Sequence, residues 1–454
     1  MRKIMFLLMI MMGCYSVYAQ SDAEILFQQG KSYNEIKDYA NAYKCFKRAA
    51  EMGHADAQNN LGVYCKEGKG GAGIPVDAFN WFMKAAEQGN ARGQYNVGLC
   101  YYEGFGVAEN PNIAFSWYLK AAQQGLAIAQ RSLGKCYKEG QGTEKNQQKA
   151  LSWYMKAAEQ GDAISQLCIS LFYLTGNGVE QNDHEAFKWS MKAAEQGNAL
   201  AQFYVGSLYK NGIGVGQNFN VAFSWLMTSA NQGNANAQYE VGTCYHSGIG
   251  IEENPKEAFK WYLKAAQQGY IEAQTNVGAC YLTGLGVEKN TQEGFKWTMK
   301  AAKQGAANAQ DNVGTCYHNG EGVEKNLIEA YGWYMKAARQ GNANAQYHAG
   351  LSYQEGEGVG KNLYEAFKWY LKSAQQGNAD AQNSVGICYY NGEGVEKNFK
   401  EAFLWFMASA KQGNAAAQYN VHLCYKNGDG VERNQEKADE WYKKAIDNGY
   451  EPSY

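Results

Sequence analysis

The sequence predicts an all-α solenoid, a stack of helix-turn-helix repeats. Three observations predict it: tryptophan recurs every 36 residues, glutamine recurs in step with it, and only four prolines interrupt the chain. The tryptophans are Trp81, Trp117, Trp153, Trp189, Trp225, Trp261, Trp297, Trp333, Trp369, Trp405 and Trp441. The glutamines run from Gln58 to Gln418. A period of this length is the signature of a stacked array, which builds a long surface and binds partners more often than it catalyses.

The first nineteen residues differ in kind from the rest. Arg2 and Lys3 precede a short apolar run, and Val17-Tyr18-Ala19 ends before Gln20 as an Ala-x-Ala-like cleavage site. This pattern predicts a signal peptide over residues 1–19 and a secreted or periplasmic protein. The alternative is an outer-membrane lipoprotein, because Gly13-Cys14 resembles a lipobox and Cys14 would then carry a lipid anchor. The apolar run is too short to cross a bilayer, and we expect no transmembrane segment.

Residues 23–56 form the next segment. They resemble a single tetratricopeptide repeat, and we expect them to cap the array at its N-terminal end. The resemblance rests on Ala23, Gly30, Tyr33, Ala42, Phe46 and Ala49.

Residues 57–452 contain eleven repeats of 36 residues, and the unit from Ala237 to Glu272 is typical. Val241 and Tyr245 belong to the apolar stripe of a first helix, which Gly248 and Gly250 end. Asn254-Pro255 then predicts the N-terminus of a second helix, with Glu257 completing a capping box, and Gly269 ends that helix. Each unit is therefore a helix hairpin that cannot bury its apolar faces alone.

Small residues mark where the helices of a hairpin meet. Most first helices carry a glycine in phase, such as Gly98 and Gly242, and we expect it to face the paired alanines of the second helix, such as Ala85-Ala86. Ser170 and His422 replace this glycine. We expect the serine to fit and the histidine to require a locally opened terminal unit. The tryptophans are expected to fill the gap between hairpins.

The Gly-x-Gly-Val loop, the Ala-Phe-x-Trp segment, the Lys-Ala-Ala-x-x-Gly ending and the 36-residue period resemble the Sel-1-like repeat, a relative of the tetratricopeptide repeat. The resemblance covers almost the whole chain after the signal peptide. It implies a right-handed alpha-alpha superhelix (solenoid).

Seven of the eleven cysteines share one phase of the repeat. Equivalent positions in neighbouring repeats lie roughly 10 Å apart, and a disulfide needs Cα atoms within about 7 Å. We therefore expect these thiols to be free and buried. A disulfide between Cys45 and Cys65 is left as an alternative. The seven are Cys100, Cys136, Cys244, Cys280, Cys316, Cys388 and Cys424.

No catalytic constellation stands out, and we expect a non-catalytic protein without cofactor or metal. The Gly-x-Gly stretches follow helices instead of strands, which favours turns over phosphate cradles. The six histidines form no metal-ligand spacing. With 42 basic against 44 acidic residues and no basic block, nucleic-acid binding has no electrostatic support.

The variable positions of the first helices carry the candidate binding site. By resemblance to tetratricopeptide arrays these helices line the concave face, and the positions one and eight residues after the recurrent glutamine lie on one helix face. Aromatic and histidine side chains gather there, which predicts a partner-binding surface. The alternative is that these rings only pack along the groove wall. The candidates are Tyr95, Tyr102, Phe203, Tyr239, His246, His318, Tyr347, Tyr390 and Tyr419.

These observations together predict an exported scaffold that binds a protein or peptide partner of unknown identity in its concave groove. One alternative is a β-lactamase-like hydrolase, by resemblance to cysteine-rich exported members of the same family. Those carry two cysteines per repeat that bridge the hairpin, whereas this chain carries one at most. A second alternative is an envelope protein that binds glycans, because aromatic grooves also stack sugars.

Overall fold

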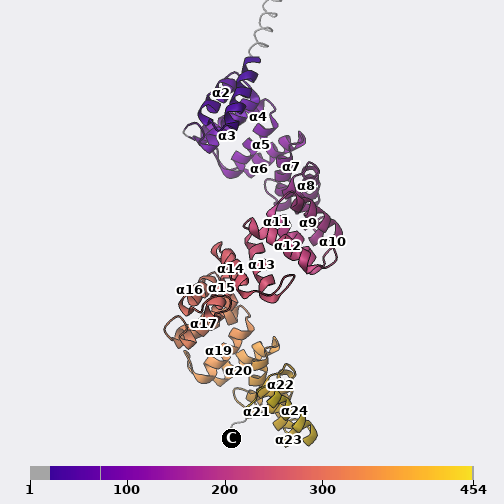
Figure 1. Ribbon diagram of the computed structural model, residues 1–454, viewed down its shortest axis with the longest axis vertical. Helices are drawn as coiled ribbons and strands as arrows, with labels where there is room; N and C mark the ends of the chain where they lie inside the picture. Colours follow the sequence, from indigo (N-terminus) through magenta and orange to yellow (C-terminus); the bar gives the residue numbers. More distant parts are fainter. Residues whose placement is uncertain (1–20, 72, 452–454) are drawn as a thin grey trace, which may run out of the picture. The chain divides into compact units, whose positions relative to one another are not determined.

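The computed structural model describes residues 21–71 and 73–451 (Figure 1). Over these residues the chain is built of helices joined by turns and contains no strand, which confirms the all-α class. None of the described helices is both long and apolar enough to cross a membrane. The expected signal peptide with Cys14, and residue 452 at the end of the array, lie outside the described residues.

The helices come in pairs that follow the repeat. Residues 21–35 are helical and precede α2 (Tyr39–Glu51). The first helices of the repeats are α3 (Ala55–Glu67), α5 (Ala91–Glu103), α7 (Ala127–Glu139), α9 (Ala163–Thr175), α11 (Ala199–Asn211), α13 (Ala235–Ser247), α15 (Ile271–Thr283), α17 (Ala307–Asn319), α19 (Ala343–Glu355), α21 (Ala379–Asn391) and α23 (Ala415–Asn427). The second helices are α4 (Pro75–Glu87), α6 (Pro111–Gln123), α8 (Gln147–Glu159), α10 (Asp183–Glu195), α12 (Phe219–Asn231), α14 (Pro255–Gln267), α16 (Thr291–Lys303), α18 (Leu327–Arg339), α20 (Leu363–Gln375), α22 (Phe399–Lys411) and α24 (Gln435–Asp447).

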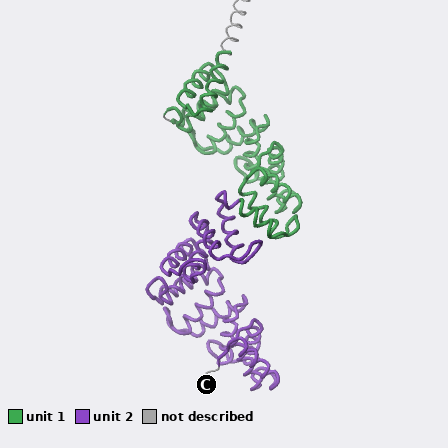
Figure 2. Tube along the Cα trace, viewed as in Figure 1, with its two compact units in different colours: residues 1–228 green, residues 229–454 purple. Residues whose placement is uncertain are grey.

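The chain divides into two compact units (Figure 2). Unit 1 ends at Thr228 and unit 2 begins at Ser229, inside α12. Within each unit consecutive helices pack against one another, so that every repeat buries its apolar stripes against its neighbours. This is the arrangement expected of a helical solenoid.

The ends of the helices follow the predicted capping residues. Asn254 caps α14, with its Oδ1 accepting from the backbone N of Glu257 at 3.1 Å, and Pro255 is the first helical residue. Gly248 ends α13 in the left-handed conformation, with φ of 66°. Gly269 follows α14 with φ of 94°. Residues with a Cβ rarely adopt this conformation, which accounts for glycine at both positions.

The recurrent glutamine holds three helices together. Gln274 of α15 is fully buried; its Nε2 donates to the carbonyl of Ala266 in α14 at 3.2 Å. Its Oε1 accepts from Nε2 of Gln304, just after α16, at 2.7 Å. Each amide thus links the first helix of its repeat to the second helices on both sides. A buried amide that loses a partner is costly, so the glutamine is a packing residue and not a ligand-binding one.

Most of the in-phase glycines make room for a ring and not for the alanine pair, so that expectation is wrong; Gly206 faces Leu226 and Gly278 faces Thr298 instead. A Cβ on Gly242 would lie 2.6 Å from the ring of Tyr262, the residue after Trp261. Where Ser170 replaces the glycine, the ring is replaced too, by Ser190. His422 fits because its Nδ1 donates to the carbonyl oxygen of Ala438 at 2.8 Å.

The ring of His422 lies 5.1 Å from that of Tyr442, which is 38 % exposed. The equivalent Tyr262 is only 3 % exposed, and it packs in a cluster with residues of the following helix, α15. Tyr442 lies in α24, the last described helix, so its exposure does not test the expected opening at His422.

The tryptophans pack between repeats. Trp297 of α16 lies against the buried cluster formed by α15 of its own repeat and α14 of the preceding repeat. Most of the tryptophans also carry a lysine over the outer ring face, as with Lys264 and Trp261, where Nζ lies 3.6 Å from the ring centroid. A ring buried on one side and covered by a cation on the other closes the junction between two hairpins.

The Gly-x-Gly loops are turns that contact the preceding repeat. Gly106 has φ of 71°, and a Cβ there would meet the carbonyl oxygen of Pro75, at the start of α4. A helix terminus already occupies the space beside this loop. The turn interpretation is therefore confirmed at this loop.

The ten cysteines in the described residues are free. Cys45 and Cys65 do not form a bridge, and the seven in-phase cysteines are buried. Burial raises the pKa of the Cys316 thiol to about 11 and that of Cys388 to about 12. These thiols are neutral, apolar core groups at physiological pH.

Candidate partner-binding surface

The candidate site residues divide into two groups by position. The first group, one residue after the recurrent glutamine, is half-buried against rings of the same repeat. Tyr239 lies 5.7 Å from the Tyr262 ring and 5.0 Å from the Tyr270 ring. Its counterparts make similar contacts: Tyr95 with Tyr118, Phe203 with Tyr204, Tyr347 with Tyr370, and Tyr419 stacked on Tyr450. These rings are therefore half-buried, and each packs against at least one other ring.

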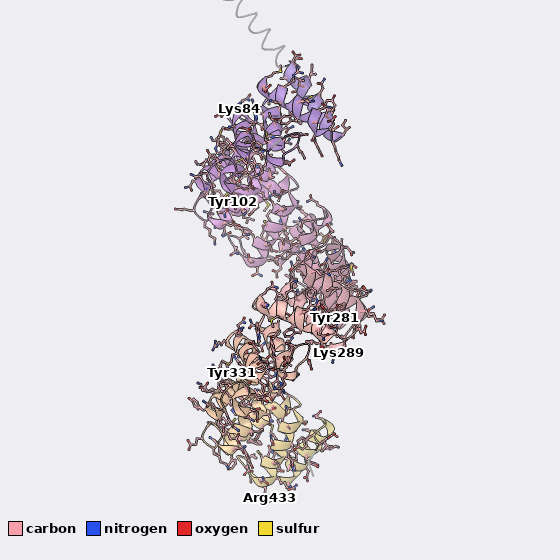
Figure 3. The ribbon with its side chains drawn as sticks, turned by 90° about the vertical axis from the view of Figure 1, so that its left-hand side faces the viewer. Lys84, Tyr102, Tyr281, Lys289, Tyr331 and Arg433 are labelled. Carbon is pink, nitrogen blue, oxygen red and sulfur yellow. The ribbon has the colours of Figure 1, made fainter. Side chains whose placement is uncertain are left out.

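The second group, eight residues after the glutamine, reaches toward the next repeat. Tyr102, labelled in Figure 3, accepts from Nζ of Lys135 at 3.2 Å. His318 Nε2 lies 2.9 Å from Glu357 Oε2, and Tyr390 donates to Asp429 Oδ2 at 2.9 Å. His246 is exposed at the same position. At Tyr102, His318 and Tyr390 this position therefore joins neighbouring repeats.

Neighbouring first helices are also joined by polar pairs that the sequence reading missed. His348 Nδ1 lies 2.8 Å from Asp311 Oδ1, between α17 and α19. Asn420 donates to Asn383 at 2.9 Å, between α21 and α23, in the same relative positions. The signal was in the sequence: polar residues occupy the first and second positions after the glutamine in successive repeats. We define the side chains at these positions, at the fifth and eighth positions, and at the middle of the Gly-x-Gly loop as the first-helix surface.

Three hollows lie on the first-helix surface of unit 2. One of about 220 Å³ is lined by His318, His348, Leu351 and Glu357, with Tyr334 as its aromatic wall. The second, of about 230 Å³, lies two repeats further on, with Tyr390, Asn420, Leu423 and Phe406 at the equivalent positions. The third, of about 280 Å³, is lined by residues that include Tyr239, Glu272 and Asn308.

Unit 1 has a larger hollow at its N-terminal end, of about 640 Å³. Its charged lining residues are mixed in sign, with Lys31, Lys69 and Arg92 beside Glu35, Asp56 and Glu67. None of the candidate residues lines it.

The nine candidates do not converge on one centre. Tyr239, His318 and Tyr390 each line a different hollow, and the others lie along first helices of both units. Over residues 21–71 and 73–451, no three His, Cys, Asp or Glu side chains are grouped so as to hold a metal ion. An array of separate contact points suits an extended partner better than a compact ligand.

Comparisons with known proteins agree with this architecture. The Sel1 repeat profile matches twelve segments: residues 23–54, 55–90, 91–126, 127–162, 162–198, 199–234, 235–270, 271–305, 307–342, 343–378, 379–414 and 415–450. It thus includes the segment that precedes the tryptophan-bearing repeats. A comparison with curated proteins gave no match.

Two solved structures are similar over most of their length. A protective antigen present in uropathogenic Escherichia coli strains, described as displaying an SLR fold, is 34 % identical; the match covers 95 % of this chain and 93 % of that one, with a TM-score of 0.79. A Sel1 repeat protein from Oxalobacter formigenes is 32 % identical over 70 % of this chain and 91 % of its own, with a TM-score of 0.54. With the repeat profile matching from residue 23 to residue 450, this chain belongs to the Sel1 repeat family.

Proposed function

We propose that this protein is an exported, non-catalytic scaffold that binds a protein or peptide along its first-helix surface, the face expected to be concave. One observation carries the proposal. The residues that recur through the repeats are occupied in packing: glutamine links three helices, glycine receives a ring in most repeats, and tryptophan packs at the junction. What varies from repeat to repeat is the first-helix surface, where a partner can be recognised.

The character of that surface supports binding of an extended partner. Half-buried tyrosines supply large, rigid contact area at a low entropy cost, and small hollows recur at equivalent junctions. The buried thiols have raised pKa values, so none is a ready nucleophile.

Export rests on the first nineteen residues, with their basic start, apolar run and Ala19 ending. Mass spectrometry of the protein recovered from cells would show a chain beginning at Gln20. A lipid-modified Cys14 would instead support the outer-membrane lipoprotein.

Selection from a displayed library of random peptides provides a test of binding. The affinity of a selected peptide is then measured for wild type and for the variant Tyr239→Ala/His246→Ala/His318→Ala. We expect at least about tenfold weaker binding, because binding energy concentrates in a few large side chains. Circular dichroism checks folding, and His246→Ala/His318→Ala retains the Tyr239–Tyr262 packing if the triple variant is unstable.

The matched control replaces Lys256, Lys260 and Lys264 of α14 with alanine. These lysines lie on a second helix, and their removal is expected to change affinity little. If the lysine variant loses binding while the aromatic variant retains it, the partner binds the opposite side and the proposal is wrong.

A further inference from the structure

The first-helix surface of unit 2 has a strong negative charge. The positions that define this surface carry six acidic residues in unit 2 against one lysine, Lys426. The acidic residues are Glu240, Asp311, Glu321, Glu357, Glu393 and Asp429. The second helices of the same unit carry an excess of the opposite sign, with fifteen basic against nine acidic residues. The negative charge of unit 2 therefore lies on the side of the first helices and not on that of the second helices.

This charge is specific to unit 2. The equivalent positions of unit 1, from α3 to α11, carry six basic residues and no acidic one. The basic ones are Lys66, Lys69, Arg131, Lys135, Lys138 and Lys210. A general preference of the repeat for acidic loops would give the same sign in both units. The opposite charge of the two units therefore indicates that the acidic residues of unit 2 serve to bind a partner.

Three of these carboxylates contact groups other than lysine or arginine. Asp311 of α17 pairs with His348, and the loop residue Glu357 pairs with His318. Asp429 accepts from the Tyr390 hydroxyl, which is neutral. With one lysine among its positions, the surface carries a net negative charge.

The acidic loop residues form a row beside the two equivalent hollows. Glu321, Glu357, Glu393 and Asp429 occupy the same loop position in four consecutive repeats. Glu357 lines the hollow with Tyr334 as its wall, and Asp429 holds the Tyr390 side chain that lines the other. Each hollow combines an apolar or aromatic wall with a nearby carboxylate, which suits the aliphatic stem and charged end of lysine or arginine.

We propose that the first-helix surface of unit 2 binds a basic, extended segment of a protein partner, with lysine or arginine side chains in the two hollows. This inference rests on the proposed function and adds the chemistry of the partner. Charge complementarity of this kind fixes which partner binds and accelerates the encounter. Binding should weaken as salt rises, because exposed charges are screened.

Peptide selection on the wild-type protein is the first test. Peptides selected by the wild-type protein should be rich in lysine and arginine. Their affinity should fall by at least about tenfold in the variant Glu321→Lys/Glu357→Lys/Glu393→Lys. The matched control is Glu324→Lys/Glu396→Lys/Glu432→Lys, three exposed residues on the same kind of loop with the same change of net charge. It should stay within about twofold of wild type. Circular dichroism and thermal melting establish that both variants fold.

The outcomes separate this inference from the proposed function. If selected peptides are neutral or acidic, or both charge variants weaken binding equally, a specific basic partner is excluded while peptide binding stands. If no peptide of either charge binds, the proposed function fails as well. If light scattering shows wild-type self-association that only the Glu321, Glu357 and Glu393 variant abolishes, the occupant is a second copy of the chain and the inference is overturned.

Discussion

Ser170 Oγ lies 2.6 Å from Ser190 Oγ, at the junction where most repeats pack a ring against a glycine. Both partners differ from the common pattern, and they differ together. A hydroxyl pair replaces a ring-on-glycine contact, so each residue is matched to the other and not only to the repeat.

This pairing predicts strong coupling between the two positions. Ser190→Tyr alone should destabilise unit 1 by about 1–3 kcal/mol, because the new ring meets the Ser170 side chain in a close-packed core. Adding Ser170→Gly should recover most of that loss by restoring the common pair. Urea unfolding of the two single variants and the double variant measures the coupling. Additive effects would show that the two residues do not share one space.

The buried glutamine predicts a second result. Gln274→Leu should cost about 1–3 kcal/mol, because it leaves the Ala266 carbonyl without its amide donor in a buried place. Gln304→Ala, which removes the exposed partner of the same amide, should cost less, since water can replace it. Chemical denaturation of both variants provides the measurement. Equal losses would mean that the inter-repeat bond, and not burial, determines the cost.

The burial of Trp261 predicts a third result. It is 7 % exposed, and Trp261→Ala should remove about 3–5 kcal/mol of local stability. Since a repeat array is held by nearest-neighbour contacts, thermal unfolding should then split into two transitions. Lys264→Ala is the control: it removes only the cation over the ring and should shift melting slightly. A single transition at the wild-type temperature would contradict an inter-repeat role for Trp261.

The buried thiols predict a dependence on pH. Burial raises the pKa of Cys388 and Cys424 from 9.0 to about 12, so the folded protein keeps their protons when the unfolded chain has lost them. Their contribution to stability is therefore complete below pH 9 and is lost as the pH rises toward 12. Guanidinium midpoints measured across this range should fall. A midpoint independent of pH would contradict burial of the thiols.

The same burial predicts slow thiol chemistry. A thiol reagent should titrate nearly all the cysteines of the unfolded, non-reduced protein, because the described ones are free. In the native protein the seven in-phase cysteines should react much more slowly. Few free thiols after unfolding would reveal disulfides and refute the prediction.

Much of the candidate surface could be located from sequence, because a fixed period places equivalent residues on equivalent helix positions. His318 and Tyr390 were predicted in this way, and both line hollows. Their partners Glu357 and Asp429 were missed. Each lies 39 residues further along the chain, in the loop of the next repeat, and the contact is created by stacking.

The sequence by itself determined the helix pair, because local signals suffice: Asn254 caps a helix, Gly269 ends one, and the 36-residue period repeats the unit. Only the tertiary structure decided which side chains pack against each other where the helices meet. Gly242 receives the Tyr262 ring where sequence reasoning expected alanines, and His348 finds Asp311 across a repeat boundary. The physical reason is that capping and turn formation depend on neighbours in the chain, whereas packing depends on the angle and offset at which one helix meets the next.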